Sequence, residues 1–258
     1  MVNSKGALKV TKKIVLITGA GRGIGAATAK CLAERGYAIC LNYRSDEVSV
    51  DRVYISLRDI GVEVMKYRAD VSVEEEVVSL FEAIDGKMGR LTALVNNAGI
   101  LLPQMSVEQM TAERINKILV TNVTSQFLCA REAVKRMARK HGGAGGAIVN
   151  VSSAASRLGS AGEYVDYAAS KSAIDTFSRG LANEVASEGI RVNCVRPGVI
   201  DTTMHADGGE PGRVARVSPM IPMGRGGTPE EVAVSIAWLL SDEASYVTGS
   251  ITDVSGGR

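Results

Sequence analysis

Short apolar, β-rich runs alternate along this chain with longer segments in which apolar residues recur at helical spacing. The first pair is the run Lys13–Thr18 and the segment Ile24–Arg35, where Ile24, Thr28 and Leu32 share one face. The same alternation predicts strands at 13–18, 37–42, 63–67, 91–95, 147–151, 191–195 and 250–254, and helices at 24–35, 45–60, 73–88, 111–140, 164–187 and 229–240.

This alternation is typical of βαβ units, which build a parallel sheet. The strands are near-continuous Val, Ile and Leu runs, as strands covered on both faces require. No change of composition marks a linker, and the glycine run Gly142–Gly146 predicts only a loop tip. We therefore expect one α/β domain over residues 1–258, a doubly wound seven-stranded parallel sheet with helices on both faces.

Composition and charge exclude several classes of function. Hydrophobic residues make up 45% and charged residues 22% of the chain, which is ordinary for a soluble globular protein. The net charge of +2 and the 4% of aromatic residues provide neither a basic surface nor stacking platforms, so we expect no nucleic-acid or membrane partner. The first residues, MVNSKGALKVTKK, contain no apolar signal core, so a cytoplasmic location is expected.

Cysteine and histidine are too sparse and too scattered to predict a metal site or a disulfide framework. The residues concerned are Cys31, Cys40, Cys129, Cys194, His141 and His205. Glycine, in contrast, is abundant, at 28 of 258 residues. That is about 11% against an average near 7%, so the positions of the glycines carry information.

Four glycines lie in the segment Thr18–Gly25 (TGAGRGIG), between the first predicted strand and the first helix. In that place glycines allow a tight turn, let backbone N–H groups approach a pyrophosphate, and let the helix start close to the sheet. The alternative is a glycine-rich helix entry without a ligand, which would carry an unneeded entropic cost. The segment therefore predicts a dinucleotide-binding loop.

The end of the second strand bears on which dinucleotide is bound. An NAD-binding protein would place an acidic residue there for the ribose hydroxyls, but the sequence has Tyr43 and Arg44, and no acid before Asp46. Arg44 and Arg22 could form a cationic pocket for the 2′-phosphate of NADP. The alternative interpretation is that both arginines are solvated on loop tips. We expect NADP(H) to be preferred over NAD(H).

Tyr167 and Lys171 are four residues apart, on one face of a predicted helix. An ammonium group near a phenol favours the phenolate, so we expect a lowered pKa at Tyr167 and a role in proton transfer. By itself such a pair could be an ordinary exposed one. Ser153, however, follows the fifth strand and Asn97 follows the fourth, at the sheet edge where ligands of open α/β sheets bind.

With these motifs the chain resembles the short-chain dehydrogenase/reductase family over nearly its whole length, which implies a Rossmann fold. The motifs are Thr18–Gly25, Asp70, Asn96–Gly99, Asn122, Ser153, Tyr167 with Lys171, Pro197–Thr202, Tyr246–Gly249 and Gly256 with Gly257. The resemblance implies hydride transfer between a nicotinamide and a carbonyl or secondary alcohol.

The resemblance also implies a catalytic role for four residues. Tyr167 would be the general acid/base, Lys171 would lower its pKa and hold the nicotinamide ribose, and Ser153, rather than Ser152, would bind the substrate oxygen. Asn122 would hold a water molecule of the proton relay.

The resemblance assigns cofactor contacts too, and implies a homotetramer or homodimer. Asp70 and Val71 would lie at the adenine, Thr202 would meet the carboxamide, and Val199 and Ile200 would lie beneath the ring. The full predicted cofactor set is Gly19, Gly21, Arg22, Gly23, Ile24, Gly25, Tyr43, Arg44, Asp70, Val71, Asn97, Ala98, Gly99, Tyr167, Lys171, Pro197, Gly198, Val199, Ile200 and Thr202.

The substrate is less well indicated. The loop between Ser153 and Tyr167 is one residue longer than is common in that family, and the segment near 203–217, rich in glycine, corresponds to its mobile lid. A set of mostly apolar residues suggests a cavity with few charges, suited to a small ketone, aldehyde or polyol. These residues are Leu101, Leu158, Tyr164 and Met204.

Two other functions remain open. Reduction of 3-oxoacyl groups on an acyl carrier protein is the main alternative, although Glu188 lies where a basic residue would help to dock that acidic partner. A basic run could compensate, or could simply stabilise the C-terminus of a helix. It comprises Arg131, Lys135, Arg136, Arg139 and Lys140. A regulatory dinucleotide-binding protein without turnover is less well supported, because all four catalytic residues are present.

Overall fold

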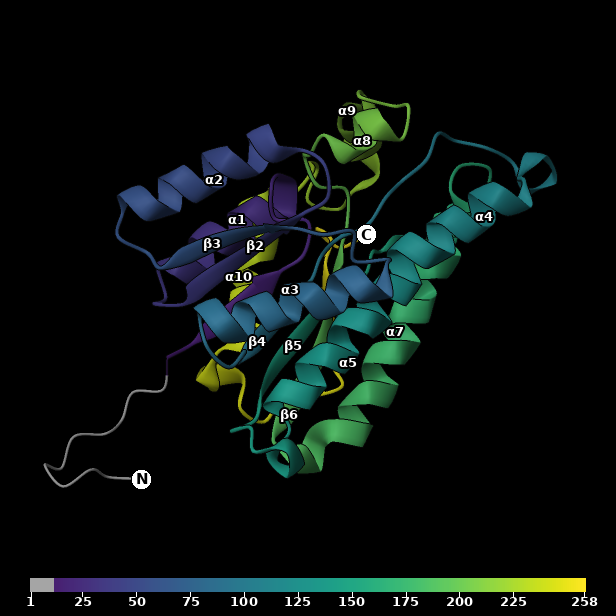
Figure 1. Cartoon of the computed structure of the whole chain (residues 1–258). Coiled ribbons are helices and arrows are strands. Elements are labelled where there is room, and N and C mark those ends of the chain that lie inside the picture. The colour runs from purple at the N-terminus through teal and green to yellow at the C-terminus, as the bar shows by residue number, and fades with distance from the viewer. Residues whose placement is uncertain (1–11) are drawn as a thin grey trace, which may run out of the picture.

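The computed structural model describes residues 12–258, which form one seven-stranded, wholly parallel sheet with helices on both faces (Figure 1). The strand order is β3-β2-β1-β4-β5-β6-β7, so the direction of winding reverses between β1 and β4. This Rossmann fold confirms the predicted fold class. The expectation about the N-terminal residues concerns positions 1–11, outside the described part. The strands are β1 Ile14–Ile17, β2 Ala38–Tyr43, β3 Val64–Arg68, β4 Ala93–Asn96, β5 Gly146–Val151, β6 Ile190–Pro197 and β7 Ile251–Val254.

The central strands are buried on both faces, as their apolar sequences predict. In β1, Val15 and Ile17 belong to one hydrophobic cluster and Ile14 and Leu16 to another, because successive side chains of a strand point to opposite faces. The first cluster packs under α1, α2 and α10, and the second under α3, α5 and α7, which lie in front of the sheet in Figure 1. These helices are α1 Gly23–Ala33, α2 Glu47–Asp59, α3 Glu74–Lys87, α5 Ser125–Met137, α7 Val165–Val185 and α10 Pro229–Leu240.

The helical stretch predicted over 111–140 is present, but it is not one regular α-helix. The segment consists of α4 (Ala112–Leu119), one π-helical turn (Val120–Thr124), α5 and a short 3₁₀ turn. The buried side chain of Asn122 lies in the π turn and forms hydrogen bonds with both the N–H and the carbonyl of Ile100. Such π turns inside helices are frequent at functional sites, and periodicity alone could not show this one, because the apolar spacing continues on both sides of it.

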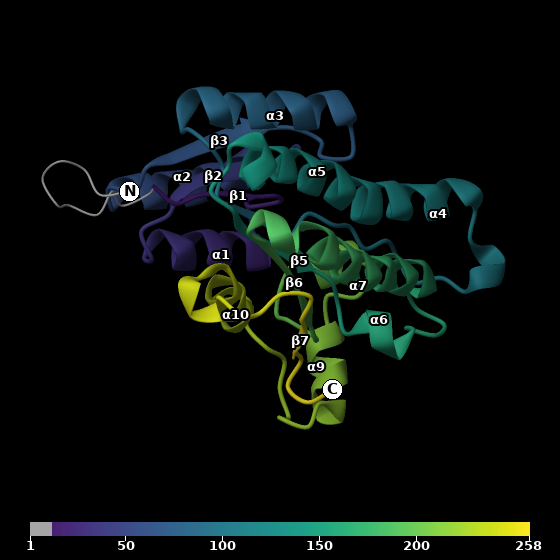
Figure 2. The same cartoon turned by 90° about the horizontal axis from the view of Figure 1, so that it is seen from below.

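The segment predicted as a glycine-rich lid contains two short helices, α8 (Met204–Asp207) and α9 (Arg213–Val217). Figure 2 shows α9 beside the C-terminal end of the chain. Another short helix, α6 (Ala155–Leu158), follows β5. Within residues 12–258, no helix combines the length and the apolar character needed to cross a membrane.

Candidate active site

A cavity of about 360 Å³ opens at the carboxyl ends of β5 and β6, a volume within the range of small-molecule sites. Side chains from both halves of the sheet line it, because the parallel strands end at the same edge. Ten of the predicted catalytic and cofactor-binding residues line it: Ile24, Asn97, Ser153, Tyr167, Lys171, Pro197, Gly198, Val199, Ile200 and Thr202.

Tyr167 and Lys171 project from α7 into this cavity. The Lys171 ammonium lies 5.6 Å from the centre of the Tyr167 ring and donates a hydrogen bond of 2.8 Å to the carbonyl of Val151. Burial raises the pKa of Tyr167 to about 12, opposed by a hydrogen bond with Ser153. The expected lowering of this pKa is therefore wrong, because burial disfavours the charged phenolate.

Burial also changes the acidity of Lys171, whose pKa is lowered to about 8. Desolvation of the ammonium is the main cause, and the nearby Cys194 and Asp175 oppose it. A lysine of this acidity can release a proton near neutral pH, which an exposed lysine cannot do.

The two serines after β5 have different environments. Ser152 is buried and donates a hydrogen bond of 3.0 Å to the backbone carbonyl of Lys171, so it fastens α7 to the sheet. Ser153 accepts a hydrogen bond from the N–H of Ala155 and contacts Tyr167. The structure thus brings Ser153 to the Tyr167 phenol, as the sequence predicts, and gives Ser152 a structural contact.

Asn122 lies behind Lys171 and does not line the cavity. Gly99 separates the two: a Cβ atom at Gly99 would lie 3.3 Å from Asn122 Oδ1 and 3.4 Å from Lys171 Nζ. Asn122 also donates to Ser170 Oγ, which donates in turn to the carbonyl of Tyr167. The π turn therefore brings a carboxamide close to the ammonium group from the far side.

The glycine loop is held against β4 by Asn97. Its amide donates to the carbonyls of Thr18 and Gly19 at 2.9 and 3.1 Å, while Thr18 Oγ1 accepts from the N–H groups of Asn97 and Ala98. A Cβ at Gly25 would collide with the Gly19 carbonyl and lie 2.7 Å from Asn97 Nδ2. The backbone is therefore packed as closely as the sequence predicts for a pyrophosphate-binding turn.

The family is decided by comparison with known sequences. A family model described as "Enoyl-(Acyl carrier protein) reductase" matches residues 19–258. The chain belongs to the short-chain dehydrogenase/reductase family. It is therefore an oxidoreductase that acts on CH–OH or C=O groups, and the family implies a nicotinamide cofactor.

Several curated proteins are similar to this short-chain dehydrogenase/reductase over almost their whole length. The "Uncharacterized oxidoreductase YgfF" of Escherichia coli (strain K12) is 62% identical, covering 95% of this chain and 99% of that protein. The cis-4-hydroxycyclohexanecarboxylate dehydrogenase of Sinomonas cyclohexanicum is 38% identical over 95% and 96% of the two chains. The 3-oxoacyl-[acyl-carrier-protein] reductase FabG of Vibrio cholerae is 36% identical, again over 95% and 96%.

Arg22 and Arg44, which were expected to form one phosphate pocket, have different partners in this dehydrogenase/reductase. Arg22 donates to Thr203 Oγ1 and pairs with Asp207, so it binds the lid. Arg44 is half-exposed, with a guanidinium nitrogen 3.9 Å from Asp70. At the end of β2, Arg44 is accompanied by Arg68 of β3, which donates a hydrogen bond of 3.1 Å to the Arg44 carbonyl. On the other side of the glycine loop, a Cβ at Gly23 would lie 3.3 Å from Thr202.

Other predicted cofactor residues have structural partners. Tyr43 packs in the core, its hydroxyl donates to Glu47, and it is not among the residues that line the cavity. The Asp70 carboxylate accepts hydrogen bonds from Ser72, and Val71 is buried. The sequence analysis missed Asn42, which accepts from the N–H of Gly19 and donates to the carbonyl of Ala69. An asparagine in an otherwise apolar strand was the available signal.

The expectation of a cavity with few charges is wrong. The four predicted residues Leu101, Leu158, Tyr164 and Met204 do line it, but so do charged groups of the lid and the C-terminus. Arg213 and Arg216 of α9 pair with Glu163 and Glu210 and thereby tie the lid to the loop before α7. These charges converge only because the extra-length loop, α9 and the C-terminus meet in space.

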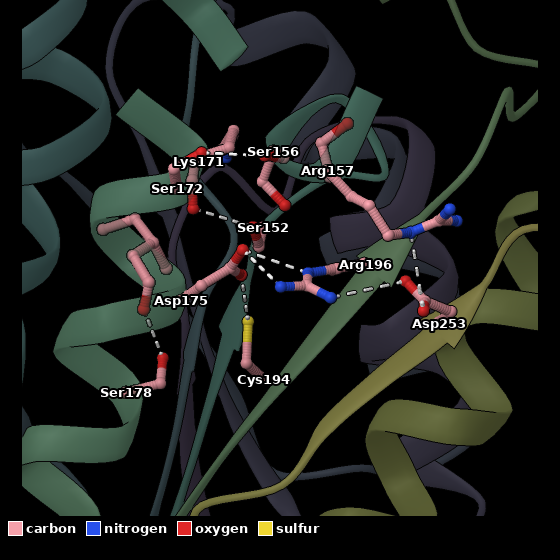
Figure 3. Close-up of polar contacts among 12 residues, drawn as sticks. Ser152, Ser156, Arg157, Lys171, Ser172, Asp175, Ser178, Cys194, Arg196 and Asp253 are labelled. Carbon is pink, nitrogen blue, oxygen red and sulfur yellow. Dashed lines mark hydrogen bonds and ion pairs between the residues drawn. The ribbon is translucent and has the colours of Figure 1, made fainter. Parts of the chain in front are cut away.

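A series of charged groups extends from α7, one turn after Lys171, to β7 (Figure 3). Asp175, one turn after Lys171 on α7, accepts two hydrogen bonds from Arg196, at 2.8 and 3.0 Å. Arg196 reaches toward Asp253 of β7, which also lies 4.0 Å from Arg157. Because Arg157 donates to the carbonyl of Arg258, this series of charged side chains connects α7, β6 and β7 with the C-terminus.

Proposed function

We propose that this protein is an NADP(H)-preferring oxidoreductase that reduces a small carbonyl substrate or oxidises the corresponding secondary alcohol. The observation that carries the proposal is the convergence of Ser153, Tyr167 and Lys171 on one cavity. The close packing of the glycine loop at Gly25 and the proximity of Gly23 to Thr202 fit a bound dinucleotide. When bound, the nicotinamide supplies or accepts the hydride.

In the direction of reduction, Ser153 and Tyr167 would hydrogen-bond the substrate oxygen, and Tyr167 would donate its phenolic proton to it. A phenol with a raised pKa is protonated at neutral pH, so it is ready to act as an acid. The phenolate that remains would be stabilised by the Lys171 ammonium, 5.6 Å from the ring. Oxidation of an alcohol would use the same groups in reverse.

Proton resupply would involve Lys171 and Asn122. Lys171, with its pKa lowered to about 8, can pass a proton toward Tyr167, and Asn122 approaches it beside Gly99. The carboxamide oxygen of Asn122 accepts a hydrogen bond from the N–H of Ile100, and its nitrogen donates one to the Ile100 carbonyl. These two contacts hold the side chain in one orientation. A water molecule bound by Asn122 would link the ammonium to solvent.

The acidity of Lys171 predicts the pH dependence of reduction. Below about pH 8 the ammonium is protonated and able to resupply the proton, so kcat should fall as the pH rises through about 8. Asp175→Asn removes a negative charge that favours the ammonium, so the fall should move to lower pH. Asp253→Asn, at the other end of the same charged chain, is the control. A pH–kcat profile that is flat from pH 6 to 9 would contradict the assignment.

Arg44 is the residue on which the preference for NADPH depends. Arg44→Asp removes the cation at the end of β2 and places a carboxylate where NAD-binding proteins have one. We expect NADPH binding to weaken by about 10- to 100-fold, as for loss of a charge-assisted contact, and NADH binding to stay equal or improve. Fluorescence titration with both cofactors measures this, with Arg52→Asp on α2 as a control for net charge. An unchanged NADPH-to-NADH ratio would refute the phosphate-pocket proposal.

Reduction of 3-oxoacyl groups on an acyl carrier protein remains the second candidate, supported by relatives of that name. Three members of the basic run that would dock an acidic carrier are neutralised, because Arg131 pairs with Glu74, Arg136 with Asp85 and Lys135 with Glu132. Small carbonyl compounds are therefore the preferred substrates. NADPH-consumption assays on free ketones, aldehydes, oxidised sugars and 3-oxoacyl thioesters distinguish the two: turnover of thioesters alone would replace the first proposal by the second.

We also propose that the chain acts in the cytoplasm as a homotetramer or homodimer. The apolar side chains of Phe127 on α5, and of Leu119 and Val120 just before it, are 39–47% exposed, and Phe127 stacks on Phe177 of α7. Such a patch over two neighbouring helices suits contact with a second copy. Analytical ultracentrifugation would measure the mass of the particle.

A further inference from the structure

Arg114 of α4 and Asp166 of α7 form an ion pair that is almost entirely buried. Arg114 Nε lies 2.8 Å from Asp166 Oδ2, and the two side chains are only 10% and 3% exposed. Removing two charges from water is costly, so a buried ion pair is weak evidence for stability. The Nη2 atom of Arg114 is also buried and has no hydrogen-bond partner among residues 12–258, so its desolvation is not offset. The contacts of the pair point to a role other than stability.

The carboxylate of this pair is bound to the backbone of the proposed general acid. Asp166 directly precedes Tyr167, and its Oδ1 accepts a hydrogen bond of 2.8 Å from the N–H of Tyr167. That N–H is in the first turn of α7, where backbone donors have no partner within the helix. Asp166 therefore fixes the backbone that carries the phenol, while Arg114 fixes the carboxylate.

The guanidinium of Arg114 also holds two other segments of the site. Its Nη1 donates a hydrogen bond of 2.8 Å to the carbonyl of Pro103, two residues after Leu101, which lines the cavity. Arg114 is on α4, which continues into the π turn that contains Asn122 and packs against α7. One side chain thus connects the segments that carry Tyr167, Leu101 and Asn122.

We propose that Arg114 and Asp166 are positioning residues, which hold the Tyr167 phenol in place against Ser153 and Lys171. Neither of the two lines the cavity, so they act on the reaction only through the groups that they hold. Displacement of a reacting group by about 1 Å can lower a rate about 100-fold. This inference rests on the proposed function, in which Tyr167 donates the proton.

Three variants test the pair with NADPH and cyclohexanone. Arg114→Met removes the charge and the contacts with Asp166 and Pro103 but keeps a side chain of similar length. We expect its kcat to fall about 10- to 100-fold, while NADPH binding, followed by fluorescence titration, changes less than about threefold. Asp166→Asn, which keeps an acceptor for the N–H of Tyr167 but loses the charge, should also lower kcat. Arg114→Lys should recover part of the loss, because an ammonium can pair with the carboxylate but lacks the fork that also holds Pro103.

Glu132→Gln is the matched control for Asp166→Asn. Glu132 is a carboxylate of α5 that is 4% exposed and pairs with Arg136, but no residue of α5 lines the cavity. This control should lower the melting temperature and leave kcat per NADPH site unchanged. If Arg114→Met does not fold, the double variant R114M/D166L replaces the whole pair by apolar side chains, which is often neutral for stability. The same loss of kcat is expected from it.

Hydrogen exchange measures the positioning without a substrate. In peptides that span residues 164–172, the amide of Tyr167 should exchange faster in Arg114→Met than in Glu132→Gln, under conditions in which the two variants are equally stable. Near-normal kcat in Arg114→Met overturns the proposal, and so does an equal loss of kcat in Glu132→Gln. A lower kcat without faster exchange at Tyr167 overturns it too. If the unaltered protein reduces no carbonyl compound, the proposed function fails instead, and exchange at Tyr167 alone then decides whether the pair orders the first turn of α7.

Discussion

Tyr167→Phe is expected to lower kcat for carbonyl reduction by about 100- to 10,000-fold, the range associated with loss of a general acid. The substitution removes the hydroxyl that contacts Ser153 and leaves the ring against Lys171. The protein should therefore still fold and still bind NADPH. Stopped-flow measurement of a single turnover, with a separate NADPH titration, distinguishes loss of the chemical step from loss of binding.

Tyr164→Phe is the matched control, because it removes a second tyrosine hydroxyl from the same cavity. That hydroxyl donates to the carbonyl of Gly208, at 3.2 Å, and has no contact with Ser153 or Lys171. A loss of less than about tenfold is expected, in line with one neutral hydrogen bond. If Tyr167→Phe kept near-normal turnover, or if both variants lost activity equally, Tyr167 would not be the general acid.

Gly25→Ala is expected to weaken binding of both NADPH and NADH by about 100-fold or more, since displacements of about 1 Å at a positioned site have effects of this size. The added Cβ would collide with the carbonyl of Gly19 and lie 2.7 Å from Asn97 Nδ2. The loop must then move away from Asn97, which holds Thr18 and Gly19 in place. Isothermal titration calorimetry with each cofactor measures the effect.

Gly86→Ala provides the comparison for this prediction. Gly86 lies exposed in α3, and a Cβ there meets nothing within 4 Å. Alanine should raise the free energy of unfolding by about 0.5–1 kcal/mol through helix propensity, with no effect on the cofactor. If Gly25→Ala bound NADPH as well as Gly86→Ala does, the glycine loop would not be the pyrophosphate site.

The assembly of the strands into one parallel sheet could be predicted from local patterns, although their order in the sheet was not predicted. The alternation of apolar strands and amphipathic helices leaves few arrangements, because βαβ connections are right-handed and parallel strands need both faces covered. Motifs placed directly after strands could be assigned to one sheet edge for the same reason. Ser153 after β5 and Asn97 after β4 accordingly line one cavity.

Other features depend on contacts between distant segments, and these were predicted less well. Asn122 was identified only through family resemblance, and the π turn that carries it arises from bonds to Ile100. Arg22 belongs to the glycine loop but is drawn away by Asp207, about 185 residues later in the chain. A sequence pattern cannot rank such competing partners for one guanidinium group.

The sequence by itself determined the sheet, the dinucleotide-type glycine loop and the pairing of Tyr167 with Lys171 on one helix, because each depends on residues close together in the chain or on the periodicity of strands and helices. Tertiary structure alone decided the acidity of the site and the character of its cavity. Burial moved the pKa of Tyr167 up and that of Lys171 down. Convergence of the lid, the loop before α7 and the C-terminus placed charged groups in the cavity wall. Desolvation and convergence both depend on which atoms surround a group in space, and the order of residues along the chain does not specify that.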